Sequence, residues 1–216
     1  MESLGVIAEA KSVSGLLQSG KSYRIPTYQR SYSWQIADAC ALIHDIVQAM
    51  DEERPHFMGA VVTCQTAIPD LLEIIDGQQR ITTVSLVLAC LRDLLPPGDT
   101  RDELQSALAN KAETGGWKLT LNHVDAPVFR ALAQKMNSTL NSDRSLPPNL
   151  SKNQLVENMV AIRDELKSLS APDRQKLAEF LLKQCPIVHV EVENRDDGYK
   201  VFQVLNTRGL QPSAHD

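Results

Sequence analysis

A short polar segment between an apolar stretch and an amphipathic one constrains the fold most. The apolar stretch runs from Leu71 to Ile75 and is rich in β-branched residues, as is typical of a buried strand. The polar segment is Asp76–Arg80 (D-G-Q-Q-R), and after it apolar residues recur at helical spacing as far as Leu95. The sequence therefore predicts a strand, a tight turn and a helix in direct succession.

This turn is a candidate anion site. The first N–H groups of a helix lack partners within the helix, and the helix dipole is positive at that end. Arg80 adds a fork of donors, and Gly77 allows a phosphate to approach the backbone. In the alternative interpretation, Asp76 only caps the helix and Arg80 is a surface charge. Spacing alone leaves both interpretations open.

Aromatic and basic residues gather in the segment 23–34 (Y-R-I-P-T-Y-Q-R-S-Y-S-W). It holds three of the four tyrosines and one of the two tryptophans, and Pro26 favours an extended backbone. Rings stack on bases and guanidinium groups bind phosphates, so we predict a surface that contacts nucleic acid or nucleotide. Its residues are Tyr28, Gln29, Arg30, Tyr32 and Trp34. The alternative is that the rings pack on the core.

The remaining chain alternates short strand patterns with longer helical ones. Helices are predicted over 4–17, 36–50 with Ser33 as N-cap, 102–112, 127–136, 155–169, 173–184 and 199–205, strands over 57–64 and 186–193, and a polar linker over 141–153. This order predicts an α/β (α+β) protein with a small sheet and a large helical insertion. We assign residues 1–95 to the first part of the core, 96–185 to the insertion and 186–216 to a strand and helix that return to the core.

Composition excludes several classes of protein. The net charge of −5 argues against a broad basic surface, although a local groove for nucleic acid is compatible with it. No apolar run is long enough to cross a bilayer, so we expect a cytoplasmic protein without a membrane partner. The four cysteines stand apart in apolar stretches, which predicts buried, reduced thiols and no zinc site.

Three separate segments resemble one family when they are taken together. They are I-P-T-Y-Q-R-S-Y-S-W at 25–34, I-I-D-G-Q-Q-R-I-T-T at 74–83 and V-F-Q-V-L-N-T-R-G-L at 201–210. Their order and spacing are similar to those of the N-terminal domain of GmrSD-type modification-dependent restriction enzymes, and phosphorothioate-sensing anti-phage proteins carry the same domain. The resemblance implies a ParB- and sulfiredoxin-like core that binds and hydrolyses a nucleoside triphosphate.

The resemblance also implies roles for individual residues. The turn carries the hydrolytic motif, with Asp76, Gln78, Gln79 and Arg80 as catalytic residues and Asp76 as the ligand of a divalent metal, Mg²⁺. Nucleotide-binding roles fall on Gly77, Arg80, Thr82, Thr83, Arg30, Asn206 and Arg208. Tyr28, Gln29 and Arg30 line the same pocket or an adjacent DNA groove. We therefore expect the fold to bring Arg208 to the turn.

The implied function is that of a sensor in an anti-phage restriction system. The domain hydrolyses nucleotide and couples recognition of modified DNA, either phosphorothioate or glucosylated, to a nuclease. No H-N-H pattern occurs in the chain, so we expect the nuclease in a C-terminal HNH domain or a partner subunit, with this chain cut before it. The sequence leaves a homo-oligomer open.

Rival interpretations come from other classes of protein. One is a ParB-like DNA-binding switch that is driven by nucleotide and hydrolyses little of it. Sulfiredoxin-like reduction needs a cysteine in the turn, where this chain has Gln78 and Gln79. The last is a structural turn in a helical interaction protein.

Overall fold

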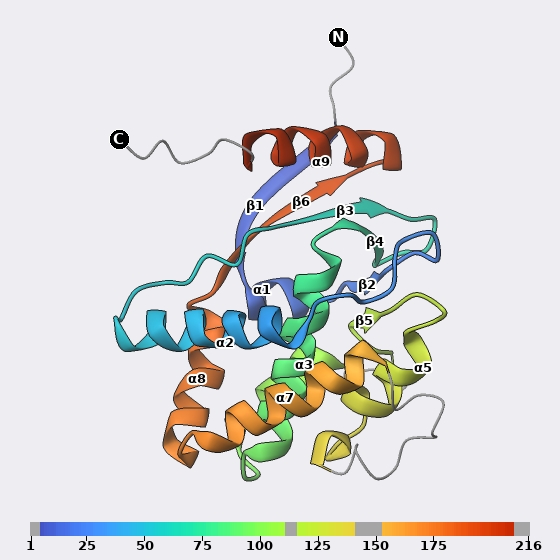
Figure 1. Ribbon diagram of the computed structural model, residues 1–216. Coiled ribbons are helices and arrows are strands. Elements are labelled where there is room, and N and C mark those ends of the chain that lie inside the picture. The colour runs from blue at the N-terminus through green and yellow to red at the C-terminus, as the bar shows by residue number, and fades with distance from the viewer. Residues whose placement is uncertain (1–4, 111–115, 141–152, 210–216) are drawn as a thin grey trace.

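The computed structural model describes residues 5–110, 116–140 and 153–209, the side chains of residues 206–209 excepted. Its centre is a six-stranded mixed sheet with the strand order β1-β6-β3-β4-β2-β5. The strands are β1 (Val6–Ser12), β2 (Ser22–Arg24), β3 (Ala60–Gln65), β4 (Leu71–Asp76), β5 (Leu119–Thr120) and β6 (Pro186–Val192). Helices lie on both faces of this sheet (Figure 1).

Parallel and antiparallel pairs both occur in the sheet. β1 is antiparallel to β6, and β3 is antiparallel to β4. β6 runs parallel to β3, β2 runs parallel to β4, and β5 adds a short parallel pair at the β2 edge. The sheet thus joins strands from the start, the middle and the end of the chain.

Most helices form a body on one face of the sheet. The helical elements are α1 (Val13–Leu17), α2 (Ile36–Asp51), α3 (Gln78–Leu94), α4 (Asp99–Leu108), α5 (Ala126–Phe129), the π-helix η1 (Arg130–Gln134), the 3-10 helix η2 (Ser138–Leu140), α7 (Gln154–Ser168), α8 (Ala171–Lys183) and α9 (Arg195–Gly209). α3 runs through the middle of this body and is buried along almost its whole length. Because neighbours surround it, α3 has apolar residues on every side rather than one stripe.

A buried ion pair joins α3 to the segments that follow α5. The side chains of Arg92 and Asp93 are both fully buried, and Arg92 Nε donates to Asp93 Oδ1 at 2.7 Å. Arg92 also donates to the carbonyls of Ala133 and Lys135, while Asp93 accepts from the N–H and hydroxyl of Thr139. These bonds satisfy charges that would otherwise be costly to bury.

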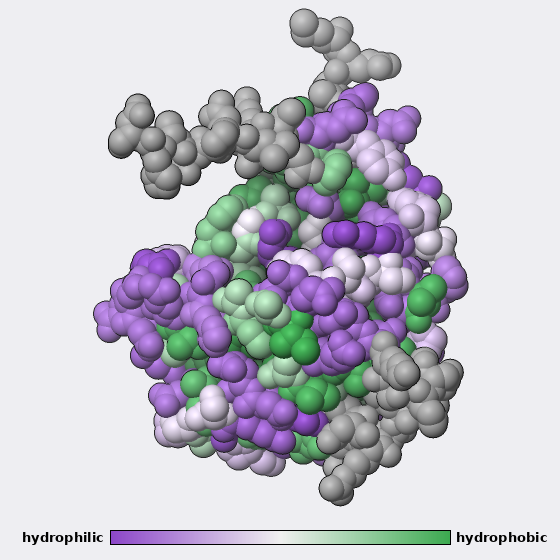
Figure 2. Space-filling view, viewed as in Figure 1, coloured by the Kyte–Doolittle hydropathy of each residue, from purple (hydrophilic) through white to green (hydrophobic). Residues whose placement is uncertain are grey.

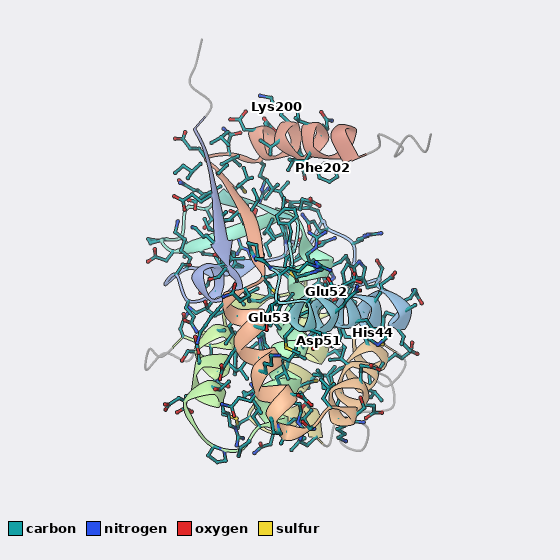
Figure 3. All side chains as sticks on the ribbon, turned by 90° about the vertical axis from the view of Figure 1, so that its left-hand side faces the viewer. His44, Asp51, Glu52, Glu53, Lys200 and Phe202 are labelled. Carbon is teal, nitrogen blue, oxygen red and sulfur yellow. The ribbon has the colours of Figure 1, made fainter. Side chains whose placement is uncertain are left out.

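The other face of the sheet has a much smaller cover. Its buried cluster consists of Val62, Cys64, Ile75, Val190 and Val192, and α9 packs across it. Figure 3 shows α9 with Lys200 pointing away from the sheet and Phe202 toward it. We call this face the α9 side and the opposite face the α3 side.

The structure confirms the predicted fold class, which is α+β. It also confirms the strand, turn and helix around Asp76–Arg80, the helix over 36–50 and the late strand. β3 begins at Ala60 rather than at 57, α4 ends at Leu108, the second mid-chain helix divides into α5 and η1, and α9 begins four residues earlier than predicted. The predicted linker lies almost wholly outside the described residues.

Two local predictions are wrong. Residues 6–12 form β1 rather than the first part of a helix, because they pair with β6 from the far end of the chain. The N-cap of α2 is Gln35 rather than Ser33, and Gln35 exchanges hydrogen bonds with Asp38 in a capping box. None of the helices in the described residues is long and apolar enough to span a bilayer.

Candidate functional site

The turn after β4 leaves the start of α3 without a side-chain cap. β4 ends at Asp76, and Gly77 occupies the N-cap position with a left-handed backbone, φ +88°. A side chain at Gly77 would meet the carbonyl oxygen of Ala60 at 2.9 Å, so only glycine fits. No side chain caps α3. The first turn therefore keeps its positive character available for an anion.

Arg80 leaves this turn toward β3. Its Nη1 donates to the carbonyl of Ala60 at 3.2 Å, and a Cβ on Gly59 would lie only 2.8 Å from the same nitrogen. Burial lowers the pKa of Arg80, and the charge of Asp76 opposes that shift. A guanidinium that is partly removed from water beside a single carboxylate binds a further anion more strongly than an exposed one.

A small hollow opens on the other flank of the turn. Gln78, Thr82 and Arg30 line it together with Asn122 and Asp125, and Ile25, Tyr32, Gln79 and Leu121 complete its walls. Arg30 is exposed, and the Oε1 of Gln78 is buried without a hydrogen-bond partner in the described part of the chain. The structure therefore brings Arg30 beside the turn, 48 positions along the chain from Gln78.

Gln79 fastens the aromatic segment to the first turn of α3. Its Oε1 accepts from the N–H groups of Ser33 at 2.8 Å and Trp34 at 3.3 Å, and its Nε2 donates to the carbonyl of Ser31 at 3.4 Å. Gln79 is buried. The amide oxygen is thus fully engaged, and one N–H of the amide also takes part, in holding residues 31–34, which we call the strap.

Tyr32 and Thr83 continue this connection into the core. The hydroxyl of Tyr32 lies 2.8 Å from Thr83 Oγ1, which donates to the carbonyl of Gln79. The N–H of Tyr32 donates to Asp125 Oδ2 at 2.7 Å, and burial raises the pKa of Asp125. Tyr32 is only 7% exposed, so its ring does not belong to the predicted surface.

The preceding residues cross the edge of the sheet. The Nε2 of Gln29 donates to the carbonyls of Ile74 at 2.7 Å and Ile75 at 3.0 Å, so this amide pairs two backbone groups at the end of β4. Tyr28 lies beyond it on the α9 side, where its ring is 49% exposed. The guanidinium carbon of Arg195 sits 5.1 Å from the ring centroid.

Two arginines meet a buried carboxylate beside Tyr28. Glu73 is almost completely buried, Arg24 donates to its Oε1 at 2.8 Å, and Arg195 donates to its Oε2 through Nε at 2.9 Å and Nη2 at 2.5 Å. Burial, and then a hydrogen bond with Tyr199, raises the pKa of Tyr28 to about 12. Arg24 and Arg195 remain partly exposed, and we call them with Tyr28 and Tyr199 the basic-aromatic cluster.

The predicted aromatic surface is therefore divided between the two sides of the sheet. Tyr28 faces α9, Gln29 holds the edge, Arg30 lines the hollow, and Trp34 packs partly buried against the main core. Asn206 and Arg208 lie on α9, but their side chains are outside the described residues. Whether Arg208 reaches the turn stays a prediction.

Some residues at these sites gave no recognisable signal in the sequence. Asn122 and Asp125 reach the hollow from the segment after β5, and Arg195 and Tyr199 reach Tyr28 from α9. The sequence feature that points to these residues is Glu73, a carboxylate inside an otherwise apolar strand, because a buried carboxylate is usually paired with a cation. Asp76 is the carboxylate of the turn, and the described residues contain no group of three metal-ligating side chains.

The fold and the turn together define an α+β domain with an uncapped helix N-terminus between two arginines. The family model described as GmrSD restriction endonuclease, N-terminal domain, matches residues 13–216. The chain belongs to this family and is thus part of a restriction system. A search of curated proteins found no match to it.

Proposed function

We propose that this chain is the nucleoside triphosphate-hydrolysing sensor domain of an anti-phage, DNA-modification-dependent restriction system. It couples recognition of modified DNA to the nuclease activity of a C-terminal HNH domain or a partner subunit. The observation that carries this proposal is the uncapped start of α3, with Arg30 on one flank and Arg80 on the other. Oriented backbone N–H groups between guanidinium groups suit a chain of phosphates.

In this proposal the nucleotide binds over the first turn of α3 and beside the hollow, whose volume of about 10 Å³ holds no more than about one water molecule. The free Oε1 of Gln78 faces no partner within the described residues, so it is available to accept from a water or a ligand donor. Thr82 lines the same hollow, and Arg30 can move onto a phosphate because it is exposed. Asn206 and Arg208 keep their proposed nucleotide-binding roles from α9.

Asp76 fits a magnesium ion that arrives with the nucleotide. Mg²⁺ commonly takes one or two protein carboxylates and completes its shell with phosphate oxygens and water, so a single aspartate suffices. Bound there, the ion would neutralise phosphate charge. The carboxylate of Asp76 would hold the ion in place, and the ion between them would offset the repulsion between this carboxylate and the phosphates.

We assign DNA contact to the basic-aromatic cluster on the α9 side. Tyr28 and Tyr199 offer partly exposed rings for stacking, and Arg24 and Arg195 offer donors to backbone phosphates. The DNA modification that it senses is a phosphorothioate or a glucosylated base. Gln29 and the strap join this cluster to the first turn of α3, which gives a physical route between DNA and nucleotide.

One observation favours a second candidate, a nucleotide-dependent DNA-binding switch with little hydrolysis. Gln79 already makes three hydrogen bonds to the strap, and both acceptor sites of its Oε1 are used, so this oxygen cannot accept the proton of an attacking water without releasing the strap. A phosphate that shifts the first turn of α3 would move the strap through the same bonds. In this reading hydrolysis only resets the switch.

Phosphate release and nucleotide binding, each measured with and without modified DNA, separate the candidates. Asp76→Asn should keep nucleotide affinity within about threefold and lower turnover at least about 100-fold, because the amide keeps the shape and loses the charge. Arg30→Ala should weaken nucleotide binding about 10- to 150-fold, since a charge-assisted hydrogen bond contributes about 1.5–3 kcal/mol. Lys176→Ala removes an exposed cation from α8 and is the matched control.

The outcomes are distinct. Tight nucleotide binding with negligible turnover in the parent protein would favour the switch. Parental turnover in Asp76→Asn would remove Asp76 from the reaction, and unchanged affinity in both Arg30→Ala and Arg80→Ala would refute the anion site.

A further inference from the structure

The outer edge of β1 is a long strand edge without a partner among the described residues. β1 is the end strand of the sheet, seven residues long, and it pairs with β6 along its other edge. Five of its seven residues are exposed, and Figures 1 and 3 show it at the margin of the sheet. An open edge presents a row of backbone donors and acceptors that can pair with another strand.

The side chains of β1 do not prevent such pairing. The strand contains no proline, and Ile7 is 56% exposed. Val6, Ala8 and Ala10 lie opposite Val192, Val190 and Val188 of β6 and extend the apolar row of the α9 side to the edge. Figure 2 shows apolar surface beneath α9 in the area of these strands.

The charges of β1 form a self-complementary pattern around Ala10. Glu9 and Lys11 flank this small residue, and their side chains lie on the same face of the strand, 3.1 Å apart as an ion pair. In an antiparallel pair of identical strands centred on Ala10, each Glu9 faces the partner's Lys11, which gives two opposite-charge pairs. A pair centred on Glu9 would instead oppose two carboxylates, and a pair centred on Ala8 would leave both charges without opposite partners.

We propose that β1 is a homodimerisation edge, where the β1 strands of two copies pair antiparallel about a two-fold axis at Ala10. The occupant is a second copy of this chain, because the Glu9 and Lys11 charges of one β1 strand are complementary to those of an identical strand that runs antiparallel to it. Ala10 meets the partner's Ala10 at the axis, where small side chains let the strands approach. The two six-stranded sheets become one continuous sheet, and the α9 sides of both copies face the same direction.

Charge reversal tests the pairing directly, with the molar mass measured by analytical ultracentrifugation over about 1–200 µM protein. Glu9→Lys places lysine opposite the partner's Lys11 and should weaken dimerisation at least about tenfold, since each cross-strand charge pair contributes up to about 1 kcal/mol. Lys11→Glu should have the same effect. The double variant Glu9→Lys/Lys11→Glu restores both opposite-charge pairs and should dimerise within about threefold of the parent.

The matched control is Asp51→Lys. It makes the same change in net charge as Glu9→Lys, on the exposed end of α2 that Figure 3 shows below the sheet. It should leave dimerisation unchanged. Circular dichroism spectra that coincide with the parent's show that each variant is folded, and a misfolded single variant is replaced by Ala10→Lys, which opposes two lysines at the axis and should also weaken dimerisation at least about tenfold.

Three results would overturn the proposal. The first is a parent protein that stays monomeric at 200 µM, even if its β1 edge binds a different protein. The second is a dimer that persists in Glu9→Lys. The third is a double variant that dimerises no better than the single variants. Because the readout is molar mass without nucleotide or DNA, failure here is independent of failure of the proposed function.

Discussion

The two sides of the sheet are built differently. On the α3 side, helices from the middle of the chain enclose a large core in which even arginine and aspartate are fully buried and paired. On the α9 side, one helix covers a cluster of five buried residues, and its first residue is held to Glu73 by an ion pair whose arginine is half exposed. The first side fixes the fold, and the second presents partly exposed polar groups.

This difference implies that the two sides differ in the free energy needed to open them. A buried ion pair is costly to break because each partner is left in a low dielectric, whereas water compensates an exposed pair. Opening the α9 side should therefore cost far less than opening the α3 side. Ligand-dependent motion is expected where the cost is low.

Arg92→Ala gives the largest expected effect, on the α3 side. The change leaves Asp93 buried without its cation and removes donors to the carbonyls of Ala133 and Lys135. We expect the free energy of unfolding to fall by about 3–5 kcal/mol, as for other broken buried pairs. Chemical denaturation measures it, with Lys176→Ala as a control that should change stability by less than about 0.5 kcal/mol. A loss below about 1 kcal/mol for Arg92→Ala would mean that this pair does not hold the helical body.

The pH dependence contributed by His189 is the next effect in size. His189 lies on the α3 side, where burial and the charge of Lys11 lower its pKa to about 4 from 6.5, although Glu191 opposes the shift. Between these values the unfolded chain binds a proton that the folded chain does not, so stability is lost as the pH falls from about 6.5 to 4. The loss is up to about 3 kcal/mol, because one pKa unit corresponds to about 1.4 kcal/mol.

His189→Gln separates this effect from the titration of carboxylates. The glutamine keeps a donor and acceptor near Thr63, which lies 2.9 Å from His189 Nε2 in the parent. The difference in unfolding free energy between parent and variant should shrink as the pH falls through this window. A constant difference from pH 7 to pH 4 would contradict the lowered pKa.

Arg195→Ala gives the smallest expected loss of global stability, on the α9 side. Its partner Glu73 keeps Arg24, and water reaches the site, so we expect a loss of about 1 kcal/mol or less. Amide hydrogen exchange should become faster along α9 and stay unchanged in α3. Arg195→Lys keeps the charge and is the control. A loss as large as that of Arg92→Ala would mean that the two sides are equally rigid.

Local patterns in the sequence predicted part of this fold. The strand, turn and helix around Gly77 could be predicted because the signal and the structure both lie within residues 71–95. β1 could not, because residues 6–12 become a strand only through their pairing with β6, whose residues lie about 180 positions away. Tertiary pairing there overrides a weak helical pattern.

The candidate site divides in the same way. Gly77 and its uncapped helix are local features, and the resemblance placed Arg30 near them. Tertiary contacts bring Asn122 and Asp125 to the hollow and Arg195 to Tyr28, and no spacing in the sequence predicts these contacts. Residues 28–32 cross from one side of the sheet to the other. A strand pattern cannot predict this crossing, because β2 already ends at Arg24 and residues 28–32 are not part of a strand.

The pairing of β1 with β6 also sets an order of events during synthesis. Val6 lies opposite Val192, so β1 leaves the ribosome long before the strand with which it pairs. At about 5–20 residues per second this delay is on the order of ten seconds or more, long enough for the helical body between them to collapse first. For that interval β1 lacks its partner strand. Chaperone binding to β1 should therefore last until β6 emerges and cease once the two strands pair.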